Sequence, residues 1–211
     1  MLFRSRVALN HLPDDPRGPD RVEALRAEGL DVIAAPGDVS RRQSAERMVA
    51  EAIAALGRLD HLVNNAGTAH VREPVTITDL DAVTDELWDA VLATNLRGSF
   101  ACARAAAPAL KVAKGGITNI ASVAGLSQPG SSMAYAASKA GVVSLTRNLA
   151  RALAPEVRVN AVAPGLVLTP WTAPWPDARK AGSADAALLK RNCVPEDIAE
   201  AVLFFVAGAA D

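Results

Sequence analysis

The sequence predicts a doubly wound α/β fold, in which helices cover a parallel β-sheet. Short apolar strands alternate with longer helical segments along the 211 residues. Strands that are separated by helices pair in parallel through crossover connections. Hydrophobic residues make up 50% of the chain and aromatic residues only 4%. Such a composition favours a core of Ala, Val and Leu packed between helices and a sheet.

The balance of charges and the few cysteines exclude several classes of function. The 22 Lys and Arg nearly match the 23 Asp and Glu, and no long block of like charge occurs, which argues against a nucleic-acid or membrane partner. Cys102 and Cys193 form no Cys-x-x-Cys motif, and the three histidines form no ligand-spaced pair, so no metal site is expected. With no apolar run of about 18 residues, we expect one cytoplasmic domain over residues 1–211.

The first elements are a short strand, a loop, a helix and a second strand. Val7–Leu9 is apolar, and the following Asn10–Asp20 carries three prolines and is expected to be a loop. A helix is expected over Arg21–Glu28, closed by Gly29 in the left-handed conformation. The second strand is expected at Val32–Ala35.

The next helix and strand are followed by a long helical segment. Ser40 and Gln43 have the spacing of a capping box, which predicts a helix start at Ser40, and Gly57 ends this helix. A third strand is expected at His61–Val63. Apolar periodicity then predicts one helix over Thr84–Leu110.

The last third of the chain repeats the alternation of strand and helix. Strands are expected at Ile117–Ala121 and Val157–Ala163, with a helix over Ala134–Ala154 between them. The stretch Thr169–Ser183 has three prolines and no periodicity, so it is expected to be a long loop over a ligand site. A final helix begins at Pro195.

Small residues and amides follow the expected strands, where a parallel sheet binds its ligands. Gly37-Asp38-Val39, Asn64–Gly67, Ser122 and Pro164-Gly165 each come directly after a strand. In open parallel sheets, ligands bind beyond the carboxyl ends of the strands. Residues of this kind let a flat polar ligand approach the backbone closely.

Tyr135 and Lys139 form the pair with the clearest chemical meaning. Their spacing of four places the phenol and the ammonium on one face of the expected helix. A nearby cation favours the phenolate and lowers a pKa that starts near 10. We therefore expect Tyr135 to serve as a general acid and base.

These residues and their neighbours resemble the short-chain dehydrogenase/reductase family. Tyr135–Lys139 follows Ser122 by thirteen positions. The resemblance runs from about Arg6 to Ala207 and lies in motifs that occur in the family's order and spacing. The other motifs are Gly37–Ser40, Asn65–Gly67, Thr94-Asn95, Pro164-Gly165 and Pro195–Ala199.

The resemblance implies a Rossmann-type three-layer α/β/α sheet and a nicotinamide cofactor, NADP or NAD. Tyr135 would give a proton to the alkoxide that develops as hydride arrives, and Ser122 would donate a hydrogen bond to the same oxygen. Lys139 would hold the nicotinamide ribose and lower the pKa of Tyr135. Asn95 would position a water in a proton relay. Other expected cofactor contacts are Asp38 and Val39 at the adenine, Asn65, Ala66 and Gly67 at the adenosine ribose, and Pro164, Gly165, Val167 and Thr169 at the nicotinamide.

Each of these residues also has a purely structural interpretation. Ser122 could bond to its own turn, Asn95 could bend a helix while bonding to backbone, and Asp38 could form a turn before Ser40. By position in the family, Trp171 and Trp175 could cover the substrate, or they could simply pack locally.

The sequence departs from the family at both ends. It lacks the family's Thr-Gly-x-x-x-Gly-x-Gly segment, so the first strand, the glycine-rich loop and the first helix are missing, and so is the last strand. In the family, that first strand lies between the strands that match Val7 and Leu62, so two edges are expected to be unpaired. The native protein has these segments, another chain fills the gap, or the fold has rearranged; we favour the first.

The residues after the first strand bear on the choice of cofactor. In the family an Asp at this place binds the ribose hydroxyls of NAD. Here Asn10-His11 stands there, with Arg17 in the loop that follows. The resemblance therefore favours NADP over NAD.

Two hypotheses of function follow from these observations. The first is a carbonyl reductase or alcohol dehydrogenase that acts on a small-molecule carbonyl or alcohol, as in the oxoacyl-carrier-protein reductase and polyol dehydrogenase branch. The alternative is a non-catalytic relic or oligomerisation partner without a phosphate-binding loop. In either case the family resemblance implies a homodimer or homotetramer built on the helices Thr84–Leu110 and Ala134–Ala154.

Overall fold

The computed structural model describes residues 5–207, and its strands form two parallel sheets. Strand β1 (Val7–His11) pairs with β2 (Val32–Pro36). Strands β3 (His61–Asn64), β4 (Gly116–Ile120) and β5 (Arg158–Val162) form the second sheet in that order. All five expected strands are confirmed. Within residues 5–207 no strand lies between β1 and β3, in agreement with the two expected unpaired edges.

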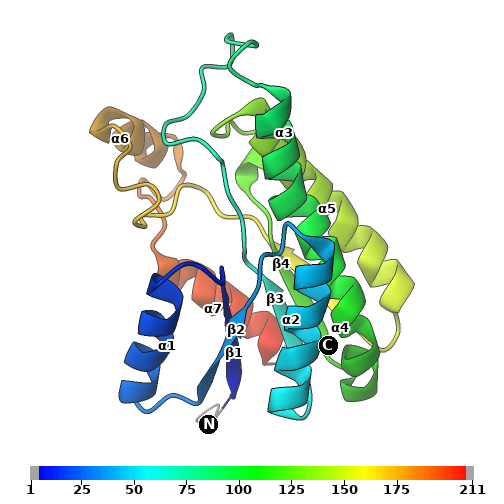
Figure 1. Cartoon of the computed structure of the whole chain (residues 1–211). Helices are drawn as coiled ribbons and strands as arrows, with labels where there is room; N and C mark the ends of the chain where they lie inside the picture. Colours follow the sequence, from blue (N-terminus) through cyan, green and yellow to red (C-terminus); the bar gives the residue numbers. More distant parts are fainter. Residues whose placement is uncertain (1–4, 208–211) are drawn as a thin grey trace.

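Helices lie on both faces of the strands, which gives the three layers that the sequence predicts (Figure 1). Helices α2 (Arg42–Leu56), α4 (Ser99–Ala113) and α5 (Met133–Leu153) pack side by side and form one layer. Helix α1 (Arg17–Ala27) packs on β1 and β2, and α7 (Pro195–Val206) packs on β4 and β5. Because α2 contacts both β1 and β2 while α4 contacts β3, these two helices link the two sheets.

Small side chains let the helices of this layer approach one another closely. Ala45 of α2 and Ala103 and Ala106 of α4 are fully buried in the main core. Leu110 of α4 and Ile117 of β4 are also fully buried there and join the helices to the sheet. The core is therefore aliphatic, as the composition predicts.

Helix α1 begins four residues earlier than expected, at Arg17 rather than Arg21. The carboxylate of Asp15 accepts a hydrogen bond from the backbone N–H of Arg17 at 3.1 Å. Pro16 and Pro19 lie at the start of the helix, where a missing N–H leaves no hydrogen bond unmade. The prolines that suggested a loop thus belong to a helix start.

Helix α2 also differs at its start, because the expected capping box at Ser40 does not form. The helix begins at Arg42. The Ser40 hydroxyl instead donates to the carboxylate of Asp38 at 2.6 Å. The Ser44 hydroxyl, in the first turn of the helix, accepts from the backbone N–H of Asp38 at 2.9 Å, and no side chain caps the helix start. At the other end, Gly57 closes the helix with φ of 79°, as expected.

The single helix expected over Thr84–Leu110 is divided into three segments. Helix α3 spans Asp85–Leu92, and a π-helical turn follows over Ala93–Gly98 before α4 begins. Single π turns within α-helices are frequent at functional sites. Here the turn contains Asn95, one of the residues expected in the site.

The expected long loop contains a helix, α6 (Asp177–Ala186), and we name residues 166–194 the lid segment. A parallel bridge between Val167 and Cys193 closes its base. The lid segment projects beyond the carboxyl ends of the strands, on the same side of the molecule as α3 (Figure 1). It therefore lies where a ligand of this fold class would be covered.

Helix α7 begins at Pro195, as expected, and the face that it turns toward the sheet is only half-buried. Val202 and Phe205 are partly buried, and Leu203 and Phe204 are exposed. Across residues 5–207, we find no helix with the length and apolar character needed to span a membrane.

Candidate active site

Tyr135 and Lys139 lie one turn apart near the start of α5. The hydroxyl of Ser132 begins this helix by accepting a hydrogen bond from the backbone N–H of Tyr135 at 3.1 Å. The ammonium Nζ of Lys139 lies 5.7 Å from the centroid of the Tyr135 ring and donates to the carbonyl of Ile120 at 2.7 Å. Lys139 is 5% exposed. The lysine is thus held under the end of β4, beside the phenol.

Ser122 follows β4 and lies near Tyr135. The Ser122 hydroxyl lies close enough to the phenol of Tyr135 to act on its pKa as a hydrogen-bond partner. Ser122 also begins a short 3-10 helix, Val123–Leu126, by accepting from the backbone N–H of Ala124 at 3.1 Å. Ser122 therefore bonds to its own turn, as in its structural interpretation, and also lies beside Tyr135.

Burial shifts the pKa of both ionisable groups of this pair. Burial raises the pKa of Tyr135 above 10.0, and the hydrogen bond from Ser122 opposes this rise. Burial lowers the pKa of Lys139 from 10.5 to about 8. The expectation that Lys139 lowers the pKa of Tyr135 is therefore not met, since desolvation dominates here. Tyr135 carries its proton at neutral pH.

Asn95 connects the loop after β3 to α5. Its Oδ1 accepts from the backbone N–H of Thr68 at 2.8 Å, and its Nδ2 donates to the Thr68 carbonyl at 3.0 Å. The same Nδ2 donates to the Ser138 hydroxyl at 2.9 Å. Asn95 is 1% exposed. Its side chain uses both amide hydrogens on protein groups, which leaves one lone pair of Oδ1 for any further contact.

Gly67 brings the loop after β3 to the edge of this cluster. A Cβ built on Gly67 would lie 3.5 Å from Lys139 Nζ and 3.4 Å from Asn95 Oδ1. The glycine backbone thus approaches both residues, and Asn65, Ala66 and Gly67 are all exposed. Five of the expected site residues, Gly67, Asn95, Ser122, Tyr135 and Lys139, therefore come together from four segments of the chain.

A chain of buried amides beneath this cluster was not assigned a role from sequence. Asn64 at the end of β3 donates to Oδ1 of Asn119 at 2.8 Å, and Asn119 donates to the hydroxyl of Thr146 at 2.9 Å. All three side chains are at most 8% exposed. Their bonds join β3, β4 and α5. The sequence signal for these hydrogen bonds is the presence of Asn64 and Asn119 near the ends of two neighbouring strands, where they are paired in register.

Val39 and Ala66 lie together, whereas Asp38 turns to its own loop. Val39, Ala66 and Gly98 line one small hollow at the strand ends. The carboxylate of Asp38 accepts from the backbone and hydroxyl of Ser40, at 2.9 and 2.6 Å. The turn-forming interpretation of Asp38 is therefore correct, and the next residue, Val39, lines the hollow.

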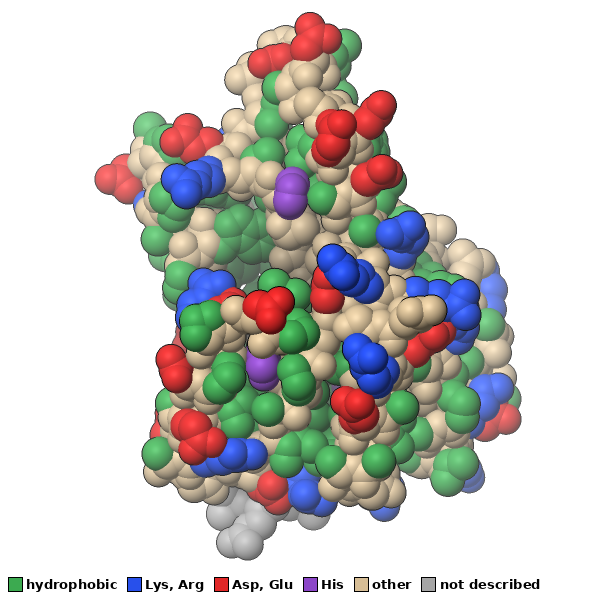
Figure 2. All heavy atoms as spheres, viewed as in Figure 1, with side chains coloured by type: hydrophobic (Ala, Val, Ile, Leu, Met, Phe, Trp, Pro, Cys, Tyr) green, Lys and Arg blue, Asp and Glu red, His purple; other side chains and the backbone are tan. Residues whose placement is uncertain are grey.

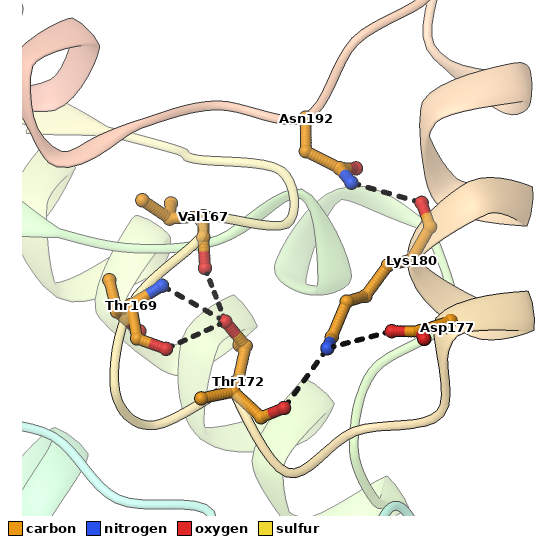
Figure 3. Close-up of polar contacts among 7 residues, drawn as sticks. Val167, Thr169, Thr172, Asp177, Lys180 and Asn192 are labelled. Atoms are coloured by element: carbon orange, nitrogen blue, oxygen red, sulfur yellow. Dashed lines mark hydrogen bonds and ion pairs between the residues drawn. The ribbon is translucent and has the colours of Figure 1, made fainter.

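Pro164 and the base of the lid segment lie beside the cluster. The carbonyl of Pro164 accepts from the N–H of Val123, next to Ser122, at 3.0 Å. Figure 3 shows how Thr172 shapes the turn between Val167 and Thr169. Its hydroxyl donates to the Val167 carbonyl at 2.8 Å and accepts from the N–H of Thr169 at 3.1 Å. Thr172 is 8% exposed and was missed from sequence.

Further bonds fix α6 to the base of the lid segment (Figure 3). Lys180 Nζ donates to the Ala173 carbonyl at 3.0 Å and pairs with Asp177 at 3.3 Å. Nδ2 of Asn192 donates to the Lys180 carbonyl at 2.9 Å. The lid segment is therefore an ordered structure rather than the irregular loop expected.

Trp171 of the lid segment contacts Tyr135 edge to face, with the ring centroids 6.2 Å apart. Beside this pair lies a cavity of about 330 Å³, bounded by the segment Pro74–Ile77, the loop Gln128–Met133 and Arg179 of α6. The surface is also hollowed between the α6 side of the molecule and the part that carries β1 and α1 (Figure 2). The cluster thus has open space on the side of the lid segment.

The residues expected to select the cofactor bond to protein groups. The side-chain amide of Asn10 donates to the carbonyls of Ala35 and Gly37, at 3.0 and 2.9 Å. The guanidinium of Arg17 bonds to Asp15 and is otherwise exposed. The family has an Asp at the end of β1, and in this chain Asn10-His11 stands at that place instead.

The residues present fit the two ends of a nicotinamide dinucleotide. Because Gly67 has no Cβ, its backbone comes close to the Lys139 ammonium, and the hollow at Val39 and Ala66 lies at the adjacent strand end. The glycine-rich motif that holds the pyrophosphate in the family does not occur among the 211 residues.

Comparisons with known proteins find similarity to reductases. The family profile described as Enoyl-(Acyl carrier protein) reductase matches residues 5–211. A ketoacyl reductase of the granaticin polyketide synthase from Streptomyces violaceoruber is 41% identical over 183 residues, which are 83% of this chain and 71% of that protein. The 3-oxoacyl-acyl-carrier-protein reductase of Staphylococcus aureus is 35% identical over 207 residues, 97% of this chain and 81% of the relative.

Solved structures show the same likeness. A short-chain dehydrogenase/reductase from Burkholderia xenovorans superimposes with a TM-score of 0.85 at 34% identity. The match covers 96% of this chain and 81% of the other. The α/β arrangement described above is therefore the arrangement of these relatives.

We predict that Asn95→Ala lowers the free energy of unfolding by about 2 to 4 kcal/mol, because it leaves buried partners of the amide unsatisfied. Urea denaturation followed by circular dichroism measures the change. Asn148→Ala is the matched control: the exposed amide of Asn148 donates only to the Ser144 carbonyl, at 2.9 Å, and its removal should change stability by less than about 0.5 kcal/mol. Equal stability of the two variants would contradict the prediction.

Proposed function

The chain belongs to the short-chain dehydrogenase/reductase family, and from this premise we propose that Tyr135 donates the proton when the chain reduces a carbonyl group. As a member, the chain is an oxidoreductase that uses NAD(P). The observation that carries the proposal is that Tyr135 lies between the hydroxyl of Ser122 and the buried ammonium of Lys139, 5.7 Å from its ring centroid.

When bound, the nicotinamide supplies the hydride that reaches the carbonyl carbon. Tyr135 holds a proton at neutral pH, because burial raises its pKa, and it gives this proton to the carbonyl oxygen as negative charge develops there. Ser122 donates a second hydrogen bond to the same oxygen and stabilises the charge. Trp171 shields the phenol from solvent on the lid side.

Lys139 and Gly67 form the wall toward the nicotinamide ribose. The Lys139 ammonium has donors to spare beyond its bond to Ile120, and we assign it the ribose hydroxyls. Asn95 holds Gly67 and α5 at this distance through Thr68 and Ser138. The relay water at Asn95 stays a prediction, for which one lone pair of Oδ1 is open.

The names of the relatives support a class of substrate. One relative is a ketoacyl reductase and another a 3-oxoacyl-acyl-carrier-protein reductase. We therefore propose that the chain reduces substrates of the 3-oxoacyl type, which carry a ketone at the third carbon of an acyl chain. Assembly into a homodimer or homotetramer through α4 and α5 is part of the same proposal.

We assign NADP as the cofactor in preference to NAD. At the end of β1 the neutral amide of Asn10 stands where an acid would select NAD. Rates with the two reduced nucleotides, compared at matched concentrations, test the choice. A higher kcat/KM with NADH than with NADPH would overturn it.

Tyr135→Phe removes the proton donor while keeping the ring that packs on Trp171. We expect kcat for ketone reduction to fall by about a hundredfold or more, with little change in the affinity for NADPH. The loss of nicotinamide absorbance in a stopped-flow experiment measures kcat, and nucleotide fluorescence measures the affinity for NADPH. A variant that keeps full turnover with every accepted ketone would remove Tyr135 from the mechanism.

The pH dependence follows from the lowered pKa of Lys139. The ammonium is largely protonated near neutral pH and loses its proton as the pH rises through about 8. We therefore expect kcat/KM for reduction to be constant near neutral pH and to fall above pH about 8. In Lys139→Arg the guanidinium stays charged, so the alkaline fall should move to higher pH. A wild-type profile with no fall in this range would contradict the assignment.

A further inference from the structure

The cavity beside Tyr135 contains one ionised side chain, Arg179, within the part of the chain that the structure describes. The remaining wall is mostly apolar, with Val75, Ile77, Val83 and Met133 among its residues. Arg179 comes from α6 in the lid segment. Its guanidinium lies 4.9 Å from the centre of the Trp175 ring and donates only to the carbonyl of Gly130, at 3.3 Å.

No carboxylate of residues 5–207 neutralises this guanidinium. Asp177, on the same helix, pairs with Lys180 instead. Acidic side chains gather over α3 and the segment that precedes it (Figure 2), and none of them lines the cavity. Partial burial lowers the pKa of Arg179 with no acidic group to raise it again. Arg179 is itself exposed, so its guanidinium lines the cavity without a counterion and can meet a charged ligand there.

The cavity and the proposed proton donor share one loop. Ser132 lines the cavity and caps the helix at Tyr135. Gly130 lines the cavity as well, and a Cβ built on it would lie 3.3 Å from the Tyr135 ring. The loop that lines the cavity thus also contacts the helix start and the ring of Tyr135.

We propose that this cavity holds the part of the substrate that carries a carboxylate, and that Arg179 selects such substrates by pairing with it. The planar guanidinium matches a carboxylate through two parallel hydrogen bonds. Its stacking on Trp175 holds it in place before the substrate arrives. The inference rests on the proposed function, because it names the class of carbonyl compound that this site prefers, a keto acid.

Levulinate and ethyl levulinate are a matched pair of ligands, since they share the ketone and differ in the charge of the carboxyl group. Binding is measured by tryptophan fluorescence, to which Trp171 and Trp175 both contribute near the cavity. We expect the wild-type chain to bind levulinate about tenfold more tightly than the ester, the range of a charge-assisted hydrogen bond. Arg179→Met should remove this difference, and Arg179→Lys should keep part of it.

Arg191→Met is the matched control, because it removes the same charge from the lid segment. Arg191 pairs with Asp197 at 2.6 and 2.8 Å and does not line the cavity. This variant should keep the wild-type preference for levulinate. Thermal unfolding of each variant checks that the lid substitutions leave the fold intact.

The results separate this inference from the proposed function. An equal affinity of the wild-type chain for both ligands, or a preference that Arg179→Met retains, would overturn the inference, even if the ester is reduced with NADPH. A preference that depends on Arg179 supports the carboxylate site. The proposed function is tested separately, by whether Tyr135→Phe lowers the rate at which the chain reduces an accepted ketone with NADPH.

Discussion

The site depends on a single buried amide, the side chain of Asn95. This amide bonds to both backbone groups of Thr68 and to the hydroxyl of Ser138. The first contact fixes the loop after β3, and the second fixes the face of α5 that carries Tyr135 and Lys139. The π-helical turn over Ala93–Gly98 brings the amide to this place. Segments separated by dozens of residues are thereby held at contact distance.

The same arrangement determines the electrostatics of the catalytic pair. Lys139 is 5% exposed, and its ammonium donates to the carbonyl of Ile120 at the end of β4. Burial that lowers the pKa of Lys139 also raises that of Tyr135. The tyrosine therefore holds its proton, as a donor in a reduction must. The amide chain from Asn64 through Asn119 to Thr146 keeps the strand ends and α5 in register beneath the pair.

Patterns that act over short distances were predictable from sequence. Alternating apolar runs located all five strands, and the spacing of Tyr135 and Lys139 predicted that both share a face of α5. The resemblance of motifs led correctly to the family. Gly29 and Gly57 both adopt positive φ at helix ends, as expected.

Contacts between distant residues decided what the sequence left open. At the break in the expected helix, Asn95 forms hydrogen bonds with Thr68 and Ser138, which lie 27 and 43 positions away. Helix α1 begins early because Asp15 bonds to Arg17, and α6 forms where prolines had suggested a loop. The direction of the Tyr135 pKa shift also depended on burial, which the spacing of two residues does not reveal.

The most direct test of the account is an equilibrium titration of the 211-residue chain with NADPH in the absence of substrate, followed by nicotinamide fluorescence. If Gly67, Asn95, Tyr135 and Lys139 form a working nicotinamide site, binding saturates in the micromolar range, about 8 kcal/mol of binding free energy. No binding up to millimolar NADPH would mean that this cluster of residues does not hold the cofactor, and it would contradict the account.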